Sequence, residues 1–363
     1  MKYQVITRKI KLNFVGEPDE RKAYWERLRG LEESAFRMAN YVSTHAYIQE
    51  KASEFTYFHE DYRDKLADRQ KDPEGILNTS HQNTTYRMLS SKYKGEVPSD
   101  IYSQVNSIVR QTFKSESKEY FTGARSLRSY RRGMPIPFSK KSMRNIEKIE
   151  EWDGNYVFTL HDMRLRTWFG RDLSGNEIIM DRAVNGEYPM CDSSIKIEDN
   201  KIFLLLTVKV PAQVYPLDKS KELVAELGIE TPIIFREGKN EYYIGGKEEF
   251  LYRRMQIQEG RRRLQIYLKY SKGGKGRKKK LQALDRYEKA EKNYVDTKIH
   301  QYTSKLVDFC VKLNCGTLVL KNQEAKEEDA KGDGFLLRNW SYYGMKEKLK
   351  YKCNINGIEI VER

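Results

Sequence analysis

The sequence predicts an α+β protein built from more than one domain. The chain has 363 residues, whereas a single domain usually takes about 100–200. Strand-like alternation of apolar and polar residues opens the chain and returns between about residues 134 and 212. After about residue 222, short apolar runs alternate with long helical patterns, which is typical of an α/β layer.

The N-terminal half reads as a β-rich unit with a helical insertion. Residues 3–14 alternate like a strand, and apolar residues then recur every three or four positions from about 19 to 51. Residues 52–100 are polar and rich in turn formers, which suggests short helices joined by loops. We expect Ser99 or Asp100 to cap a helix that continues to about Tyr120 and exposes Gln104 and Arg110.

Strands return in the second part of this unit. The stretch 126–141 combines basic and aromatic residues with two prolines. Strand patterns follow at 156–160, 195–197 and 201–210, and the last two strands are joined by a hairpin turn at 198–200.

The C-terminal part begins after a linker at 213–221. LVAELGIETPIIF predicts one apolar strand and EYYIGG a second, and a long basic helical stretch with a break at 271–280 follows. A strand comes after Gly316, then a helix from Tyr342 to Cys353, and a last strand from Ile358 to Val361.

Charge is concentrated in one segment of the chain. The net charge is +15, and residues 251–298 hold sixteen Lys and Arg against five Asp and Glu, a difference of +11. Evenly spread lysines would indicate only a solubilising surface, but clustering of this size favours a nucleic-acid partner.

Several classes of protein are disfavoured. The four cysteines form no CxxC pair, which argues against a structural zinc site and a disulfide framework. The first residues lack the apolar core of a signal peptide, and no run of about 18 apolar residues predicts a membrane span. We therefore expect a soluble, cytoplasmic protein.

A possible catalytic centre lies at two strand ends. Glu226 interrupts an apolar strand, and metal-dependent phosphodiester hydrolysis needs two or three such acids converging on the ions. The next strand offers Lys321 where a second acid is needed. Glu324, three residues further on, is another candidate for the missing acid.

Three stretches of the C-terminal part resemble motifs of a known protein family. Residues 223–235, 314–324 and 339–362 are similar to three motifs in the RuvC-like nuclease half of miniature type V CRISPR effectors (V-F-like) and of TnpB proteins: G-I-D-L-G, G-x-I-x-x-E-D-L, and N-W-x-x-x-x-L-x-x-K-L-x-Y-K-A-x-x-x-G-I-x-V. Residues 181–190 and 126–141 resemble the nucleic-acid-binding wedge region of the same family.

The departures from the family pattern point to lost cleavage. Glu226 stands where the family has its first catalytic Asp, and Lys321 stands where it has its catalytic Glu. The family pattern continues into a zinc ribbon and a third catalytic Asp, and we expect this chain to lack both because it ends at Arg363. We expect Lys321 to form an ion pair with Glu226 in place of a metal ion, or else to point to solvent.

The resemblance implies a domain organisation. It predicts a first strand of a barrel-like wedge domain at 1–16, a helical recognition insertion at 17–125, the remainder of the wedge domain at 126–212, the linker at 213–221, and a truncated RuvC-like (RNase H fold) domain at 222–363 with a basic helical segment at 251–298.

The resemblance also implies a nuclease-dead, RNA-guided DNA-binding protein that needs no cofactor and acts in transcription regulation. Its expected partners are a guide RNA, double-stranded target DNA, a second copy of the chain, and a sigma factor or RNA polymerase, and its expected place is the prokaryotic nucleoid. In this family base pairing reads the target, and the protein reads a short flanking motif and the shape of the heteroduplex. The alternatives are an active guided endonuclease and a guide-independent nucleic-acid-binding protein.

Basic and aromatic residues are the candidate contacts for nucleic acid, because cations bind phosphates and aromatic rings stack on bases. For RNA or DNA they are Tyr130, Arg131, Arg132, Phe138, Arg261, Arg262, Arg263, Lys272, Lys275, Arg277, Lys278, Lys279 and Lys280. For the flanking motif they are Asn83, Tyr86, Arg87 and Gln104.

Overall fold

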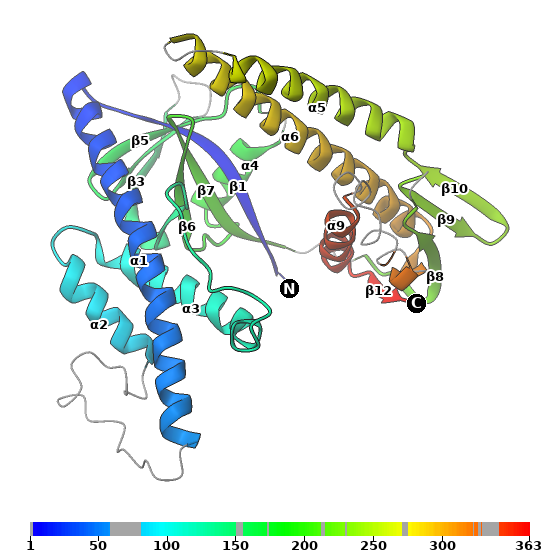
Figure 1. Ribbon diagram of the computed structural model, residues 1–363, viewed down its shortest axis with the longest axis horizontal. Helices are drawn as coiled ribbons and strands as arrows, with labels where there is room; N and C mark the ends of the chain where they lie inside the picture. Colours follow the sequence, from blue (N-terminus) through cyan, green and yellow to red (C-terminus); the bar gives the residue numbers. More distant parts are fainter. Residues whose placement is uncertain are drawn as a thin grey trace. The chain divides into compact units, whose positions relative to one another are not determined.

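The computed structural model shows a mixed α+β protein that divides into two compact units, Tyr3–Pro211 and Ala212–Arg363 (Figure 1). It describes residues 3–58, 81–149, 155–172, 174–211, 215–228, 231–270, 275–321, 323–325, 328 and 341–363. The α+β class predicted from the sequence is confirmed at this level.

The first unit is organised around a seven-stranded antiparallel sheet. Its strand order is β2-β6-β7-β1-β5-β4-β3, with β1 Tyr3–Phe14, β2 Ile136–Phe138, β3 Met143–Lys148, β4 Tyr156–Leu160, β5 Met163–Trp168, β6 Ser193–Glu198 and β7 Lys201–Pro211. The predicted hairpin is present, since Glu198 pairs with Lys201 and both turn residues, Asp199 and Asn200, have positive φ.

The connection between the two edge strands requires this sheet to curl. β2 and β3 lie at opposite edges, yet only residues 139–142 join them, three of which form the short helix η1, Lys140–Ser142. A flat sheet of seven strands would be about 29 Å across at about 4.8 Å per strand, whereas five Cα steps reach at most about 18 Å. The edges therefore approach each other at this connection, which we call the seam.

Four helices accompany the sheet: α1 Pro18–Phe58, α2 His81–Tyr93, α3 Ser99–Phe121 and α4 Asn176–Val184. The core joins sheet residues such as Leu165 and Leu206 to the helical stripe predicted for α1, in which Leu28, Ala35 and Met38 are fully buried. The sequence did not indicate α4.

The prediction that Ser99 or Asp100 caps the N-terminus of α3 is wrong. Pro98 precedes the helix, and no side chain caps its free N–H groups. Asp100 lies inside the first turn, where its carboxylate instead accepts hydrogen bonds from the backbone N–H of Ser139 and the hydroxyl of Ser142, both at the seam. The long-range partners therefore take the carboxylate away from the helix end.

The second unit holds a five-stranded mixed sheet in the order β10-β9-β8-β11-β12. Its elements are β8 Asp218–Glu226, β9 Ile233–Glu237, β10 Asn240–Ile244, α5 Lys247–Lys269, α6 Lys275–Lys312, β11 Cys315–Lys321, α9 Tyr342–Asn356 and β12 Glu359–Glu362. β11 runs parallel to β8 and β12, while β9 is antiparallel to both neighbours.

Two strand boundaries differ from the sequence prediction. Residues 223–235 form parts of two antiparallel strands, because the chain turns between Gly228 and Pro232 and the Gly228 N–H donates to the Pro232 carbonyl. A side chain at Gly228 would lie 2.7 Å from the Thr231 carbonyl oxygen, so this turn requires glycine. β8 also begins at Asp218, inside the predicted linker.

Helices α6 and α9 bury one face of this sheet. Leu306 and Cys310 of α6 and Leu349 of α9 pack against Leu318 and Leu320 of β11. Burial raises the pKa of the Cys310 and Cys353 thiols, so both act as small apolar residues of this core. In the part of the chain that the structure describes, no helix combines the length and apolar character needed to cross a membrane.

Candidate nucleic-acid interface

The structure brings Glu226 and Lys321 together at the ends of two adjacent parallel strands. They are register partners in the β8–β11 pair. The preceding residues, Ala225 and Leu320, are buried in the core, and side chains alternate along a strand. Glu226 and Lys321 therefore share the face of the sheet opposite α6 and α9.

The ion pair that the sequence suggests between them is not formed. Lys321 is exposed and Glu226 is half-buried, and among the ion pairs of the described residues none joins the two. The charge of Glu226 instead acts on Arg236 of β9, whose pKa is raised mainly by its hydrogen bond with Glu241 and to a smaller degree by Glu226. Lys321 follows the alternative expectation and points to solvent.

No cluster of metal ligands occurs in the described part of the chain, where no three His, Cys, Asp or Glu side chains lie close enough to share an ion. Glu324 is exposed just after β11. Gln323, beside it, is buried, and its amide donates to the Lys321 carbonyl oxygen at 2.7 Å.

The basic segment folds as two helices, α5 and α6, that pack together. Arg254 donates to Glu291 at 2.8 Å and Gln258 donates to the same oxygen at 2.7 Å. Burial alone would raise the pKa of Glu291, but these hydrogen bonds outweigh it and lower the pKa. Gly260 allows close approach, because a Cβ there would lie 2.7 Å from the Tyr287 ring.

Three of the predicted arginines lie on α5. Arg261 is half-buried and contacts Glu288 at 3.5 Å, while Arg262 and Arg263 are exposed and contact Glu259 at 3.2 and 3.3 Å. Exposed pairs of this kind are weak, so both side chains can exchange Glu259 for a phosphate. Lys279 of α6 is exposed. Lys272 and the side chains of Lys275, Arg277, Lys278 and Lys280 lie outside the described residues.

The aromatic side chains that lie near these arginines on α5 were not singled out from the sequence. Tyr267 and Tyr270 are 63% and 82% exposed, and Tyr252 and Met255 line a shallow hollow with Arg262 and Arg263. We call Tyr252, Met255, Arg262, Arg263, Ile266, Tyr267 and Tyr270 the outer face of α5, because their helical spacing places them on one side. The signal was available as tyrosines recurring among arginines at helical intervals.

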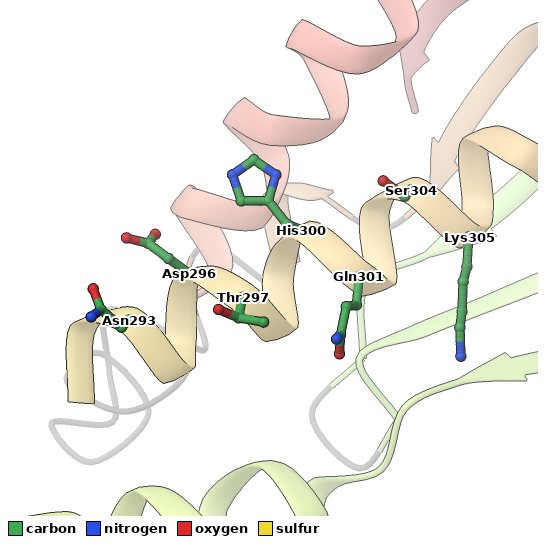
Figure 2. A pocket seen from close by; sticks show the side chains of 7 residues that line it. All are labelled: Asn293, Asp296, Thr297, His300, Gln301, Ser304 and Lys305. Atoms are coloured by element: carbon green, nitrogen blue, oxygen red, sulfur yellow. The ribbon is translucent and has the colours of Figure 1, made fainter. Parts of the chain in front are cut away.

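A second polar surface lies on α6, where a hollow of about 760 Å³ is lined by residues from Asn293 to Lys305. Figure 2 shows that His300 projects from one side of the helix and Gln301 and Lys305 from the other. Lys348 of α9 lies 2.9 Å from the His300 ring.

Lys352 of α9 is half-buried below this surface. Its ammonium donates to the His300 carbonyl at 2.6 Å and to the hydroxyls of Thr303 and Ser304 at 2.9 and 2.7 Å. Burial, followed by the charge of Lys348, lowers the pKa of Lys352 to about 8.

In the first unit, Tyr130, Arg131, Arg132 and Phe138 do not form one surface. Phe138 is 1% exposed in the core, so its predicted stacking on nucleic acid is wrong. Tyr130 is half-buried against that core and fixed by backbone hydrogen bonds to Asn40. Arg132 pairs with Glu33, and Arg131 is exposed and makes no ion pair with any described residue.

Three of the residues predicted to read the flanking motif share one side of α2. Asn83, Tyr86 and Arg87 are exposed there. Gln104 of α3 is separate, because its amide donates to Asp192 at 2.8 Å. Arg110 is not on the exposed face: burial lowers its pKa to about 10, and its guanidinium donates to the His81 carbonyl at 2.9 Å.

Comparison with known proteins gives matches over most of the chain. It is 26% identical over 330 residues to the CRISPR-associated endodeoxyribonuclease Cas12f1 of Sulfoacidibacillus thermotolerans, which covers 86% of this chain and 76% of that protein. It is 28% identical over 212 residues to Cas12f1 of Syntrophomonas palmitatica, with 57% and 41% covered. No family model matches the chain.

A solved structure has the same fold. The cryo-EM structure of a Cas12f1–sgRNA–target DNA complex superposes with a TM-score of 0.61 at 18% identity, covering 99% of this chain and 89% of that one. Sequence and fold thus agree, and the chain is homologous to Cas12f1, a miniature type V CRISPR effector.

Proposed function

We propose that the protein binds double-stranded DNA at sites chosen by a guide RNA and does not cleave it. The observation that carries the proposal is that Glu226 and Lys321 are register partners at the ends of the adjacent strands β8 and β11. Ligands of α/β sheets bind outside the carboxyl ends of such strands, so the register partner of Glu226 at this edge is a solvent-directed cation and not a second metal-binding acid.

The charge of Lys321 opposes a metal beside Glu226. Neighbouring strands lie about 4.8 Å apart. Two like unit charges repel by about 3 kcal/mol at a separation of about 5 Å and an effective dielectric constant of 20, and by less at the greater distance of a solvent-directed ammonium; a divalent ion doubles the repulsion. Among the described residues, the pairing of Glu226 with a cation does not fit a two-metal site, and we derive no hydrolytic step through it.

The remaining surfaces suit binding without chemistry. The outer face of α5 combines exposed rings with Arg262 and Arg263, a composition that stacks on bases and neutralises phosphates. Asn83, Tyr86 and Arg87 on α2 supply polar and aromatic groups for a flanking duplex. Guide pairing would supply the sequence specificity, as in other RNA-guided proteins.

Binding without cleavage would regulate transcription. The bound complex would either block RNA polymerase or recruit a transcription factor such as a sigma factor. Both outcomes require only occupancy of a guide-specified site. The activity of the relatives as endodeoxyribonucleases supports the alternative of a guided nuclease that uses Glu226 and Glu324.

The test is purification of the full chain with the RNA that it holds, followed by sequencing of that RNA. The complex is then mixed with matching and scrambled DNA duplexes in the presence of magnesium, with Cas12f1 of Sulfoacidibacillus thermotolerans as the cutting control. We expect guide-dependent binding and intact DNA. Cut DNA would overturn the proposal in favour of the nuclease, and equal binding without RNA would favour a guide-independent protein.

A further inference from the structure

A cavity of about 510 Å³ opens at the seam of the curled sheet in the first unit. Its walls come from three places that are far apart in sequence: the start of α3, the connection between β2 and β3, and the β4–β5 hairpin. Its size falls within the usual range for small-ligand sites, about 300–1,000 Å³. Its lining includes the polar and charged residues Asp100, Lys141, Ser142, Arg144 and His161.

His161 is a buried side chain with one ring nitrogen, Nε2, that has no hydrogen-bond partner among the described residues. It occupies the two-residue turn between β4 and β5 with a left-handed backbone, φ +47°. Its ring packs edge-on against Phe138, and the side chain is only 8% exposed. Nε2 has no hydrogen-bond partner and lies 3.6 Å from the Asp100 carboxylate, too far for a hydrogen bond. A buried polar atom in this state costs free energy unless a ligand satisfies it.

Asp100 leaves hydrogen-bonding capacity in the same cavity. Its Oδ2 accepts from the Ser139 N–H at 3.1 Å and the Ser142 hydroxyl at 2.5 Å, and Oδ1 accepts from no described residue. The first turn of α3 adds N–H groups that no side chain caps. The cavity lining therefore offers hydrogen-bond acceptors on Asp100 and backbone donors at the start of α3.

Two cations, Lys141 and Arg144, also line the cavity. Neither forms an ion pair with a described residue. The remaining acid of the wall, Asp162, contacts Arg27 at 3.3 Å. The cavity thus combines a carboxylate and an imidazole with two cations available for a phosphate.

We propose that this cavity binds a single nucleotide of a nucleic-acid strand, with the base edge against Asp100 and His161 and the phosphate against Lys141 and Arg144. Base N–H groups would donate to Asp100 Oδ1 and make the hydrogen bond that His161 Nε2 lacks. A bare phosphate meets the Asp100 carboxylate and gains less, and a divalent cation is opposed by Lys141 and Arg144. The nucleic-acid class of the ligand rests on the proposed function.

The experiment uses the full chain labelled with ¹³C at histidine Cε1, which gives five signals for its five histidines. His161→Asn identifies the His161 signal, and asparagine tolerates the left-handed backbone at this turn. Guanosine 5′-monophosphate, its 2′-deoxy form and inorganic phosphate are titrated separately, so that ribose, deoxyribose and phosphate alone are distinguished.

We expect the His161 signal to shift saturably with nucleotide and at least tenfold more weakly with phosphate. Loss of a charge-assisted contact in Lys141→Ala or Arg144→Ala should weaken nucleotide binding about tenfold. Lys209→Ala, an exposed lysine of β7 in the same unit, should leave it unchanged.

An unmoved His161 signal in the wild-type chain would overturn the inference, whether or not the variants fold. Equal affinity for phosphate and nucleotide would overturn it as well. Either result would leave the proposed function standing if guide RNA still co-purifies, so the two failures are distinguishable.

Discussion

At the ends of β8 and β11, an exposed ammonium and a half-buried carboxylate occupy paired positions on one face of the sheet. Changing the sign of the charge at Lys321 alters what Glu226 can bind. Two carboxylates at these positions attract a divalent cation, whereas Lys321 repels it.

We expect Lys321→Glu to make the thermal stability of the protein depend on magnesium. The Tm of the wild-type chain should change by less than 1 °C between 0 and 10 mM Mg²⁺, whereas the variant should gain several degrees because the ion binds the folded state. Differential scanning fluorimetry measures both values.

The matched control is Lys312→Glu, which makes the same charge change at an exposed lysine near the end of α6. It should respond to magnesium like the wild type. A wild-type Tm that already rises with magnesium would contradict the exclusion of metal by Lys321.

Lys352 provides a pH prediction. Its pKa is lowered from 10.5 to about 8, chiefly by burial, so between about pH 8 and 10.5 the unfolded chain binds more protons than the folded chain. Stability therefore contains a penalty at neutral pH that disappears as pH rises through this window. Compared with Lys352→Met, the wild-type Tm should improve from pH 8 to pH 10.

The titration itself can be followed by ¹³C NMR of lysine Cε. One signal should titrate near pH 8, and it should be absent in Lys352→Arg. If every lysine signal titrates above pH 9.5, the hydrogen bonds to His300, Thr303 and Ser304 hold the ammonium charged and the prediction fails.

The position of a residue could be predicted from the sequence where a local pattern determines it, and could not where tertiary contacts do. Glu226 and Lys321 follow local strand patterns, and parallel strands bring their carboxyl ends to one edge. Phe138 and Arg110 could not be placed from sequence, because their burial depends on tertiary partners, the sheet core for Phe138 and α1 and α2 for Arg110. His161 gave no sequence signal, since its neighbours Asp100 and Ser142 are distant in the chain.

At the scale of elements, the outer face of α5 combines exposed aromatic rings with exposed arginines. Each base stacked on an aromatic ring contributes about 1–3 kcal/mol. Among the described residues, Arg262 and Arg263 form ion pairs with Glu259 alone, and these contacts are exposed. We therefore expect the outer face of α5 to contribute to the affinity for single-stranded nucleic acid and to the salt dependence of that affinity.

We expect the double variant Tyr267→Ala with Tyr270→Ala to bind a fluorescein-labelled 20-nucleotide uridine strand at least tenfold more weakly, as measured by fluorescence anisotropy. Arg262→Ala with Arg263→Ala should lower the slope of log affinity against log salt by about 1.4, or about 0.7 per phosphate contact.

Tyr351→Ala is the control, because Tyr351 is an exposed tyrosine on α9, at 55% against 63% for Tyr267 and 82% for Tyr270. Its affinity should equal that of the wild type. An effect of Tyr351→Ala as large as that of the α5 double variant would show that this face has no special role.

Element prediction succeeded where the signal was local. The β6–β7 hairpin followed from Asp199 and Asn200, which tolerate positive φ. The apolar run 223–235 was misread as one strand, because hydrophobicity alone does not reveal the turn at Gly228 and Pro232. The cap of α3 was misassigned because Asp100 binds residues of the seam about forty positions away.

At the scale of the whole molecule, the two units have separate hydrophobic cores. Leu165 belongs to the core of the first unit and Leu306 to that of the second, and both are fully buried. The sequence indicated this division through the change from alternating strands to strand–helix patterns near residue 212. Which side chains pack against one another within each core could not be predicted from the sequence.

Separate cores predict separate unfolding transitions. Leu165→Ala and Leu306→Ala each remove buried methyl groups and leave a cavity, which costs about 2–5 kcal/mol. In differential scanning calorimetry of the full chain, each variant should lower one transition and leave the other unchanged, and the double variant should show the sum of both shifts. Coordinated shifts of both transitions in either single variant would show that the units unfold as one cooperative body.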